Sequence, residues 1–351
     1  MIQAMTKTAV ACIGNGFVGG SLTTCFSERG FDVYTYDKSG KRVVGGQPAY
    51  RPNPERMRTH QYEASSIAEL VAGCESEQNF SSVYFVCVPT PMFEDGSADL
   101  SIVESVLDEL ASVSRGKCLK CEGTGTEATY PCRTCNGECL RLEHRIAVVK
   151  STVPPGSTEK WNKKYESGSL RVVFNPEFLT EANALDDMRN QTRIVLGGPR
   201  PHINRVKQIF QTAFPKVPII KTSSTTAEMV KYFINVQLAA RVVLSCELAQ
   251  ICEALDKTGL DIDYDKVVEY ANYDKRLGGS HMNVPGNDGL PGAKGHCFTK
   301  DLNALAAVAR AVDVKPTVMD AVWKKNLEIV LPEHRDWEKM VGRAVSKKQK
   351  S

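Results

Sequence analysis

The chain has 351 residues, of which 42% are hydrophobic and 24% charged, and its formal net charge is +3. This length and composition exclude fibrous and disordered proteins and allow two domains with apolar cores. Basic residues are spread along the chain except for a short C-terminal cluster, so we expect no nucleic-acid partner. No charged-then-apolar leader opens the chain, and no run approaches the ~20 apolar residues of a membrane helix, so we expect a cytoplasmic protein without a membrane partner.

A glycine-rich loop follows the first apolar stretch. Residues 8–13 predict a short strand, a helical pattern runs to position 29, and a second strand is predicted over 32–36. The loop between the first strand and the helix consists of Gly14, Asn15, Gly16, Phe17, Val18 and Gly19. Such glycines permit a tight turn and bring a pyrophosphate close to the helix N-terminus, which predicts a dinucleotide-binding βαβ unit.

The preferred dinucleotide is NAD. Asp37 follows the second strand, at a position where an acidic residue binds the ribose hydroxyls and would repel the 2′-phosphate of NADP. Lys41 is a further candidate cofactor contact, and together with Arg42 it keeps NADP as the alternative.

Three polar motifs follow predicted strands, at 89–91, 151–158 and 175–181. Because the carboxyl ends of strands in a doubly wound sheet face the ligand crevice, Thr90 is placed to touch the cofactor; a turn residue between two prolines is an equal interpretation. Glu177 and Glu181 are four residues apart and would share a face if a helix began there, with solvated helix charges as the alternative.

Five of the twelve cysteines lie within positions 118 to 139. Four of them form two C-x2-C pairs separated by ten residues: Cys118, Cys121, Cys132 and Cys135. This spacing predicts a tetrahedral structural zinc site, and a redox-active pair is the alternative. The local pattern resembles one cysteine-rich repeat of DnaJ-type chaperones, from which only zinc-knuckle geometry is carried over. Cys139 and His144 are spare ligands, and residues 117–144 are expected to be an outgrowth on a loop.

Residues 224–255 carry an uninterrupted helical pattern without proline or glycine. Thr225 and Glu228 have the spacing of a capping box, and the helix would span on the order of 50 Å. Such a long helix links domains or packs against a twin, so we expect a homodimer through it. Lys231 and Asn235 lie four apart on one face, for which a solvated surface is the alternative.

Residues 292–301 read Gly-Ala-Lys-Gly-His-Cys-Phe-Thr-Lys-Asp. Cys297 is predicted to lie in a loop just before a helix that begins near Leu302, where the helix N-terminus favours the thiolate. A thiolate beside Lys300 and Asp301 can attack an aldehyde and form first a thiohemiacetal and then a thioester. A buried structural cysteine is the alternative.

Taken together, these motifs resemble one family, the UDP-glucose 6-dehydrogenases and their GDP-mannose relatives. The matching stretches occur in family order: Gly14–Gly19 with Asp37, Val88–Pro91, Ser151–Thr158, Asn175–Glu181, Glu228–Asn235, Arg276–Gly278 and Gly295–Asp301.

The resemblance implies a four-electron, NAD-dependent oxidation of a nucleotide sugar at C6, with UDP-glucose as the default substrate. It implies that Lys231, Asn235 and Asp301 manage the hydroxyl proton and that Cys297 captures the aldehyde. Glu177 would help water release the thioester, and Thr152 would position that water or the cofactor. The implied substrate-binding residues are Phe178, Leu179, Glu181, Lys231, Asn235, Gly295 and Arg276, the last reaching the partner subunit's substrate.

The chain also departs from the family pattern. Ala293 and Lys294 stand where the family usually has Phe-Gly, which leaves the sugar open. Thr299 replaces a proline in the first helical turn, where threonine is an acceptable cap. The zinc insert is not part of the common pattern, and because the sequence ends at Ser351 we expect the family's usual third, nucleotide-holding domain to be absent.

We therefore expect an α/β protein with an N-terminal Rossmann-type doubly wound parallel sheet, a long connecting helix and a C-terminal all-helical domain. The expected domains are an NAD-binding domain over 1–221, which contains the insert, and a helical dimerisation and substrate domain over 222–351. Two alternatives remain: a two-electron β-hydroxyacid-type dehydrogenase, and a non-catalytic zinc-knuckle binding protein on a dehydrogenase scaffold.

Overall fold

The computed structural model describes residues 9–39, 43–44, 47–48, 61–75, 83–114, 124, 126–127, 130–131 and 144–348. The chain divides into two compact units, one formed by residues 1–88 and 101–229 and the other by residues 89–100 and 230–351. The division falls inside one long helix, between Met229 and Val230. Each unit is described by itself.

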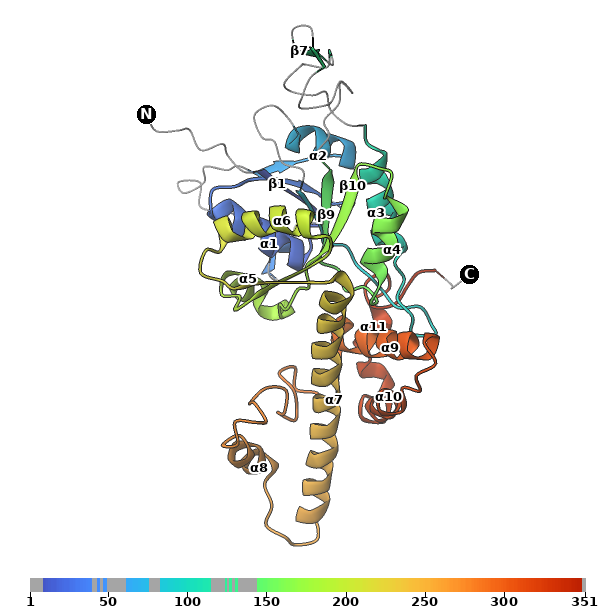
Figure 1. The fold of residues 1–351 in the computed structure, drawn as a ribbon. Helices are drawn as coiled ribbons and strands as arrows, with labels where there is room; N and C mark the ends of the chain where they lie inside the picture. The colour runs from blue at the N-terminus through green and yellow to red at the C-terminus, as the bar shows by residue number, and fades with distance from the viewer. Residues whose placement is uncertain are drawn as a thin grey trace. The chain divides into compact units, whose positions relative to one another are not determined.

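The first unit is built on an eight-stranded sheet (Figure 1). Neighbouring strands are parallel except for one antiparallel pair, β10 with β11. In order across the sheet the strands are β12 (Ile219–Thr222), β11 (Ile194–Gly197), β10 (Leu170–Phe174), β9 (Arg145–Val149), β6 (Val83–Val86), β1 (Ala9–Ile13), β2 (Asp32–Tyr36) and β5 (Gln61–Glu63). The predicted doubly wound α/β sheet is confirmed.

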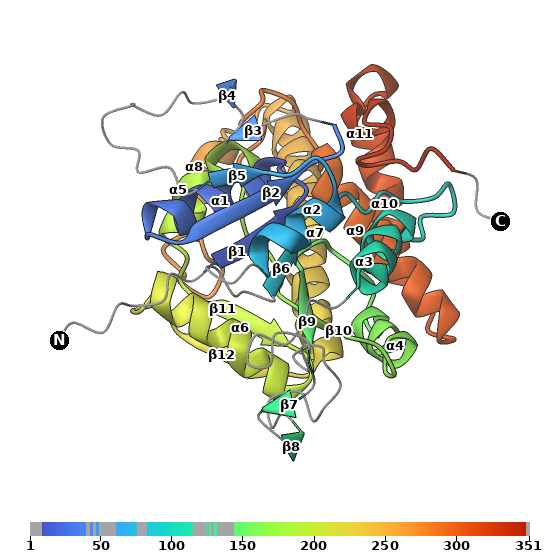
Figure 2. The same cartoon turned by 90° about the horizontal axis from the view of Figure 1, so that it is seen from above.

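Helices cover both faces of this sheet (Figure 2), which is why its central strands are continuous apolar runs. The helices of the first unit are α1 (Phe17–Glu28), α2 (Ile67–Cys74), α3 (Ser101–Ser112), α4 (Ser157–Lys164), η1 (Glu181–Asn183), α5 (Ala184–Arg189) and α6 (Arg200–Ala213). Side chains of α1, α5 and α6 share one apolar cluster with the strands, centred on Phe26, Phe85 and Phe210. This layer supports the strand ends that carry the predicted motifs.

Four short strands form two separate hairpin-like pairs: β3 (Val43–Val44) with β4 (Gln47–Pro48), and β7 (Thr126–Glu127) with β8 (Tyr130–Pro131). The second pair lies within the predicted zinc insert. The four predicted zinc ligands and Cys139 lie outside the described residues.

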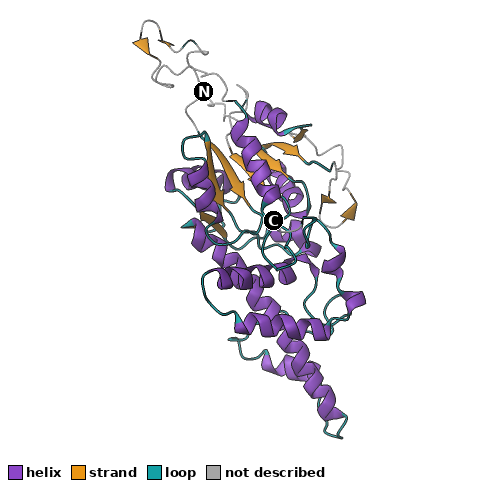
Figure 3. Ribbon diagram, turned by 90° about the vertical axis from the view of Figure 1, so that its right-hand side faces the viewer, coloured by secondary structure: helices purple, strands orange, loops and turns teal. Residues whose placement is uncertain are grey.

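All named elements after β12 are helices (Figure 3). They are α7 (Ser224–Asp256), α8 (Tyr264–Ala271), α9 (Gly295–Ala311), α10 (Thr317–Ile329), η2 (Pro332–His334) and α11 (Asp336–Lys339). The expected long helix and helical C-terminal region are confirmed. None of the helices within the described part of the chain has the length and apolar character needed to cross a membrane.

The second unit also contains the segment 89–100, which pairs with the end of the chain. Met92 N donates to Ala344 O at 2.8 Å, and Ser346 N donates to Met92 O at 2.8 Å. Met92 joins a second apolar cluster with Val243, Val330 and Trp337. The residues after α10 are therefore part of the core of this unit.

Two local predictions were wrong. The hydroxyl that accepts a hydrogen bond from the first turn of α7 is that of Ser223, which receives Thr226 N at 3.2 Å, whereas Thr225 Oγ1 bonds to Glu159 at 3.0 Å. The other concerns α9, which begins at Gly295 and not near Leu302, so Cys297 lies inside the first helical turn.

Candidate active site

The glycine-rich loop has the geometry of a phosphate cradle. Gly14 has φ +89°, and a Cβ there would lie 2.6 Å from Cys87 O. A Cβ on Gly19 would lie 1.9 Å from Gly14 O, so only glycine allows α1 to pack this closely. A Cβ on Gly16 would meet nothing within 4 Å, and α1 begins after it without a side-chain cap. A helix N-terminus binds anions through backbone N–H groups, and this loop lets a pyrophosphate come close to that of α1, so these residues fit a dinucleotide.

The remaining cofactor candidates divide between the two units. Phe17 and Val18 open α1, and Asn15 N donates to Asp37 Oδ2 at 2.7 Å, which fixes the acid at the end of β2 beside the loop. Thr90 is buried in the segment 89–100 of the second unit. Lys41 lies outside the described residues.

Buried polar groups follow β9 and β10. Lys150 Nζ donates to Asn175 Oδ1 at 2.8 Å, and Asn175 Nδ2 donates to Val195 O at 2.8 Å. Thr152 and Glu177 are also buried, and Glu177 Oε1 accepts a hydrogen bond from Leu179 N at 2.5 Å. The structure thus brings polar groups to the carboxyl ends of both strands.

The shared helical face predicted for Glu177 and Glu181 does not form. Glu177 lies in irregular backbone, while Glu181 is exposed and begins η1. Phe178 lies between them, half-buried, with the Arg193 guanidinium 4.3 Å from its ring centroid. The rigid proline at position 176 precedes this stretch, and the backbone groups of residues 179 and 180 bond to carboxylates instead of to a helix.

Glu228 ties α7 to the loop that carries Thr152. Its carboxylate accepts hydrogen bonds from Gly156 N at 2.6 Å and from Thr158 N at 2.8 Å, at the N-terminus of α4. Burial raises the pKa of Glu228, and the two backbone donors oppose that shift. The residue assigned to a capping box therefore caps a different helix, which local spacing could not show.

In the second unit, α7 and α9 bring together a buried polar cluster. Asn235 Nδ2 donates to Asp301 Oδ2 at 2.6 Å, and Lys300 Nζ donates to Asp301 Oδ1 at 2.5 Å. Lys231 is buried one turn before Asn235 on α7. A solvated face for Lys231 and Asn235 is excluded, because the two are only 4% and 6% exposed.

Cys297 is half-buried in the first turn of α9, two residues after its first residue. Its neighbour His296 is buried, and burial, followed by the positive charges of Arg343 and Lys300, lowers the pKa of His296 to about 3. The imidazole is therefore neutral at physiological pH. Thr299 Oγ1 donates to Gly295 O at 2.7 Å, so threonine does not act here as a helix cap.

Arg276 lies on the surface of the long loop. It forms a bidentate ion pair with Asp274, with Nε at 2.9 Å from Oδ1 and Nη2 at 2.5 Å from Oδ2. The pair raises the pKa of Arg276 and lowers that of Asp274. The guanidinium is held in an exposed position, away from the buried cluster of its own unit.

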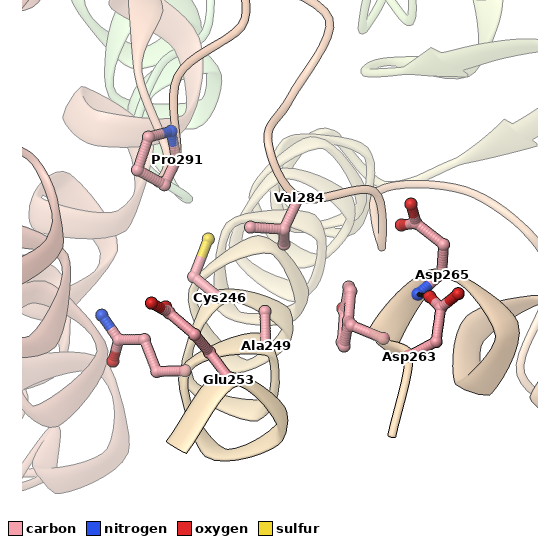
Figure 4. Close-up of a pocket in the computed structure, with 9 residues that line it drawn as sticks. Cys246, Ala249, Glu253, Asp263, Asp265, Val284 and Pro291 are labelled. Atoms are coloured by element: carbon pink, nitrogen blue, oxygen red, sulfur yellow. Dashed lines mark hydrogen bonds between the residues drawn. The ribbon is translucent and has the colours of Figure 1, made fainter. Parts of the chain in front are cut away.

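A cavity of about 380 Å³ opens between α7, α8 and the loop that follows (Figure 4). The lining residues include Cys246 and Glu253 of α7, and Asp263 and Asp265 at the start of α8. None of the residues that line it belongs to the predicted site.

Sequence reasoning missed three residues: Asn326 and Asp336, which bond to the backbone just before Cys297, and Lys150 of the first unit, which bonds to Asn175. Only Asn326 carried a signal, as a polar residue on the apolar face of a predicted helix. Within the described part of the chain, no group of three or more His, Cys, Asp or Glu residues could hold a metal ion.

The fold and the glycine-rich loop define a dinucleotide-binding α/β protein with a helical second unit. The sequence matches the NAD binding domain of the UDP-glucose/GDP-mannose dehydrogenase family over residues 8–142 and 137–214, and the central domain of that family over residues 225–328. The chain belongs to this family.

Individual relatives agree with this assignment. The chain is 29% identical over 89% of its length to a UDP-glucose 6-dehydrogenase of Haloferax volcanii, and 30% identical over 90% of its length to one of Pseudomonas aeruginosa. It covers 68% and 64% of those proteins, so it spans about two thirds of their length. A UDP-glucose dehydrogenase structure from Pyrobaculum islandicum aligns with a TM-score of 0.69 at 25% identity, over 93% of this chain and 69% of that one.

Proposed function

We propose that this chain is an NAD-dependent nucleotide-sugar dehydrogenase that oxidises a C6 hydroxyl to the uronic acid, with UDP-glucose as the default substrate. One observation carries the proposal: α7 and α9 join Asn235, Lys300 and Asp301 in a buried hydrogen-bonded cluster, and Cys297 lies one turn before Asp301 on the same helix. Bound NAD supplies a hydride acceptor for each of the two oxidations.

The first oxidation needs a group that takes the hydroxyl proton. The two carboxyl oxygens of Asp301 are oriented by Asn235 and Lys300. With Lys231 and a water molecule, this carboxylate would accept the proton as the hydride leaves C6. The low exposure of the cluster excludes bulk water and strengthens each of these interactions.

The second oxidation needs a tetrahedral carbon. The Cys297 sulfur would form a bond to the aldehyde carbon, while the carbonyl π pair moves to the oxygen, which takes a proton from Lys231 or water. Transfer of a second hydride to NAD, with return of the hydroxyl proton to Lys231 or water, would leave a thioester. Water, activated by Glu177 and Asp301 and positioned by Thr152, would add to the thioester carbon and expel the thiolate.

Substrate contacts are assigned to Phe178, Leu179, Glu181, Lys231, Asn235, Gly295 and Arg276. The identity of the sugar stays open, because Lys294 adds a cation to the stretch before the His-Cys pair. Its Nζ lies 2.6 Å from Asp288 Oδ2. We also propose a structural zinc held by Cys118, Cys121, Cys132 and Cys135, on their spacing alone.

A homodimer is part of the proposal. On α7, Phe233, Leu244 and Ile251 are 58%, 56% and 50% exposed, and α8 is amphipathic in sequence but has no buried residue. Single exposed apolar residues are ordinary, but a row of them on one long helix is typical of an interface. A second copy would cover this row.

The test of the function is the NADH yield per molecule across a panel of nucleotide sugars. A uronic acid requires two NADH per substrate, whereas a β-hydroxyacid-type dehydrogenase forms one. Cys297→Ala should lose the second oxidation, because hydride leaves the aldehyde-level carbon only after a nucleophile has added. One NADH per substrate in the unmodified protein, or none with every sugar, would reject the proposal.

A further inference from the structure

Asn326 of α10 holds the peptide backbone just before Cys297. Its Oδ1 accepts a hydrogen bond from Ala293 N at 2.8 Å, and its Nδ2 donates to Ala293 O at 2.9 Å. The Asn326 side-chain amide thus bonds to both the N–H and the C=O of Ala293, as the backbone of a neighbouring β-strand would. Asn326 is 1% exposed and Ala293 4%, so loss of either hydrogen bond would leave a buried polar group without a partner, which is unfavourable.

The residue before Ala293 is also fixed. Gly292 has φ +91°, and a Cβ at this position would lie 2.3 Å from Val330 Cγ2 and 3.1 Å from Asn326 Oδ1. The backbone therefore passes in close contact with the end of α10. This contact leaves the segment little room to move away from Asn326.

Asp336 holds the segment at a second point. It is the first residue of α11, and its two carboxylate oxygens lie 3.0 and 3.2 Å from Gly295 N. Lys294, the N-cap residue of α9, makes no side-chain capping bond. The Asp336 carboxylate, which comes from another helix, accepts the hydrogen bond from Gly295 N in its place. The next residue, Trp337, is 1% exposed in the apolar cluster, which anchors Asp336.

We propose that Asn326 and Asp336 are positioning residues that fix the first turn of α9 and thereby aim the Cys297 thiolate at the aldehyde carbon. Asn326 bonds to the residue four positions before Cys297, and Asp336 bonds to the residue two positions before it. Because Gly295 and Cys297 belong to the same helical turn, fixing the backbone of one limits the movement of the other. This inference rests on the proposed function, to which it adds two residues with stated roles. A displacement of about 1 Å between reacting atoms can cost on the order of a hundredfold in rate.

The kinetic test compares Asn326→Ala and Asp336→Ala with the unmodified protein. We expect kcat to fall about tenfold to a hundredfold in both variants. KM should change little in Asn326→Ala, because Ala293 is not a proposed substrate contact, whereas Asp336→Ala also releases Gly295, which is one. Asp336→Asn keeps an acceptor for Gly295 N and should restore most of the rate. Leu327→Ala is the matched control: it removes packing from the same helix but makes none of these hydrogen bonds.

A second readout uses no cofactor or sugar: the rate at which iodoacetamide alkylates Cys297 at neutral pH, followed by peptide mass spectrometry. Alkylation should slow in Asn326→Ala and Asp336→Ala, because a loosened first turn stabilises the thiolate less. It should be unchanged in Leu327→Ala.

The two measurements distinguish the positioning role of Asn326 and Asp336 from the proposed dehydrogenase activity, because alkylation needs neither cofactor nor sugar. Slower alkylation in the two alanine variants, with no NADH formed from any sugar, would support the positioning role and reject the dehydrogenase. Folded variants that keep both kcat and the alkylation rate would overturn the positioning role, as would a Leu327→Ala variant with the same losses.

Discussion

Asp301 is buried, and both of its carboxylate oxygens have partners. Lys300 Nζ and Asn235 Nδ2 approach its two oxygens to 2.5 and 2.6 Å. Removing one partner of a buried ion pair costs ~3–5 kcal/mol, because the other charge stays buried. The contacts that orient this carboxylate for proton transfer therefore also stabilise the fold, and a variant such as Lys300→Ala should lose stability as well as activity.

His296 makes stability depend on pH. Burial and nearby positive charges lower its pKa to about 3, below the ordinary value of 6.5, so the folded state binds a proton less readily than the unfolded state. This contribution is fully present above pH 6.5 and is lost as the pH falls toward 3. The loss should approach ~1.4 kcal/mol per pH unit below the ordinary pKa.

The measurement is the free energy of unfolding in denaturant at a series of pH values between neutral and mildly acidic. His296→Gln should flatten the decline relative to the unmodified protein, whereas His334→Gln, at an exposed position, should not. Equal slopes in all three proteins would show that His296 does not titrate differently on folding.

At the scale of elements, α7 organises both units through different residues. Ser223 caps its start, and Glu228 in its second turn receives the N-terminus of α4. Asn235, further along, reaches Asp301 on α9. These hydrogen bonds fix the 33-residue helix at its start, in its second turn and at Asn235. Glu228 therefore has a structural role, while Asn235, two turns further on, orients the proposed proton acceptor.

Described residues on either side of the insert between α3 and β9 bond to each other. Arg145 opens β9, and its guanidinium donates to Leu110 O and Ser114 O at the end of α3 and to Glu75. Arg145 and Ser114, which flank the insert in sequence, are thereby joined.

The spacing of the four predicted cysteines leads us to expect about one zinc per chain in metal analysis of protein purified without chelator. Cys121→Ser should lose the metal and lower stability before it lowers dehydrogenase activity, because the insert is far in sequence from the catalytic motifs. Cys74→Ser, in a buried cysteine far from the pattern, is the control that should keep the metal. Metal-free native protein would refute the zinc assignment.

At the scale of the whole molecule, the prediction concerns a site shared between two subunits. Arg276 is presented on the surface by its ion pair with Asp274 and does not reach the buried cluster of its own unit. A two-fold interface through the exposed face of α7 would deliver two such loops at once. Arg276→Ala should raise the substrate KM about tenfold or more, as expected for losing a charged hydrogen bond of ~1.5–3 kcal/mol.

Mixing Arg276→Ala with Cys297→Ala tests the sharing directly. If each site takes Arg276 from its partner, a hybrid dimer regains one intact site and its activity rises above that of either parent. If subunit exchange is confirmed and activity does not rise, Arg276 acts in the site of its own chain and the shared-site prediction is wrong.

The sequence by itself determined the features that local chemistry controls. The spacing of Gly14, Gly16 and Gly19 fixes a tight turn before a helix, strands of continuous apolar residues predict a covered parallel sheet, and the uninterrupted pattern after 223 predicts α7. Ordered motifs then sufficed to assign the family and to single out Cys297 and Asp301.

Only the tertiary structure decided which distant residues support those motifs. Glu228 caps α4 from 70 residues away, and Asn326 and Asp336 hold the backbone before Cys297 from 33 and 41 residues away. Periodicity and capping rules describe neighbours within one or two turns, so they assigned Glu228 to the wrong helix and began α9 too late. Tertiary packing determines these partners, because a buried N–H group must have a hydrogen-bond acceptor and the fold decides which acceptor lies within reach.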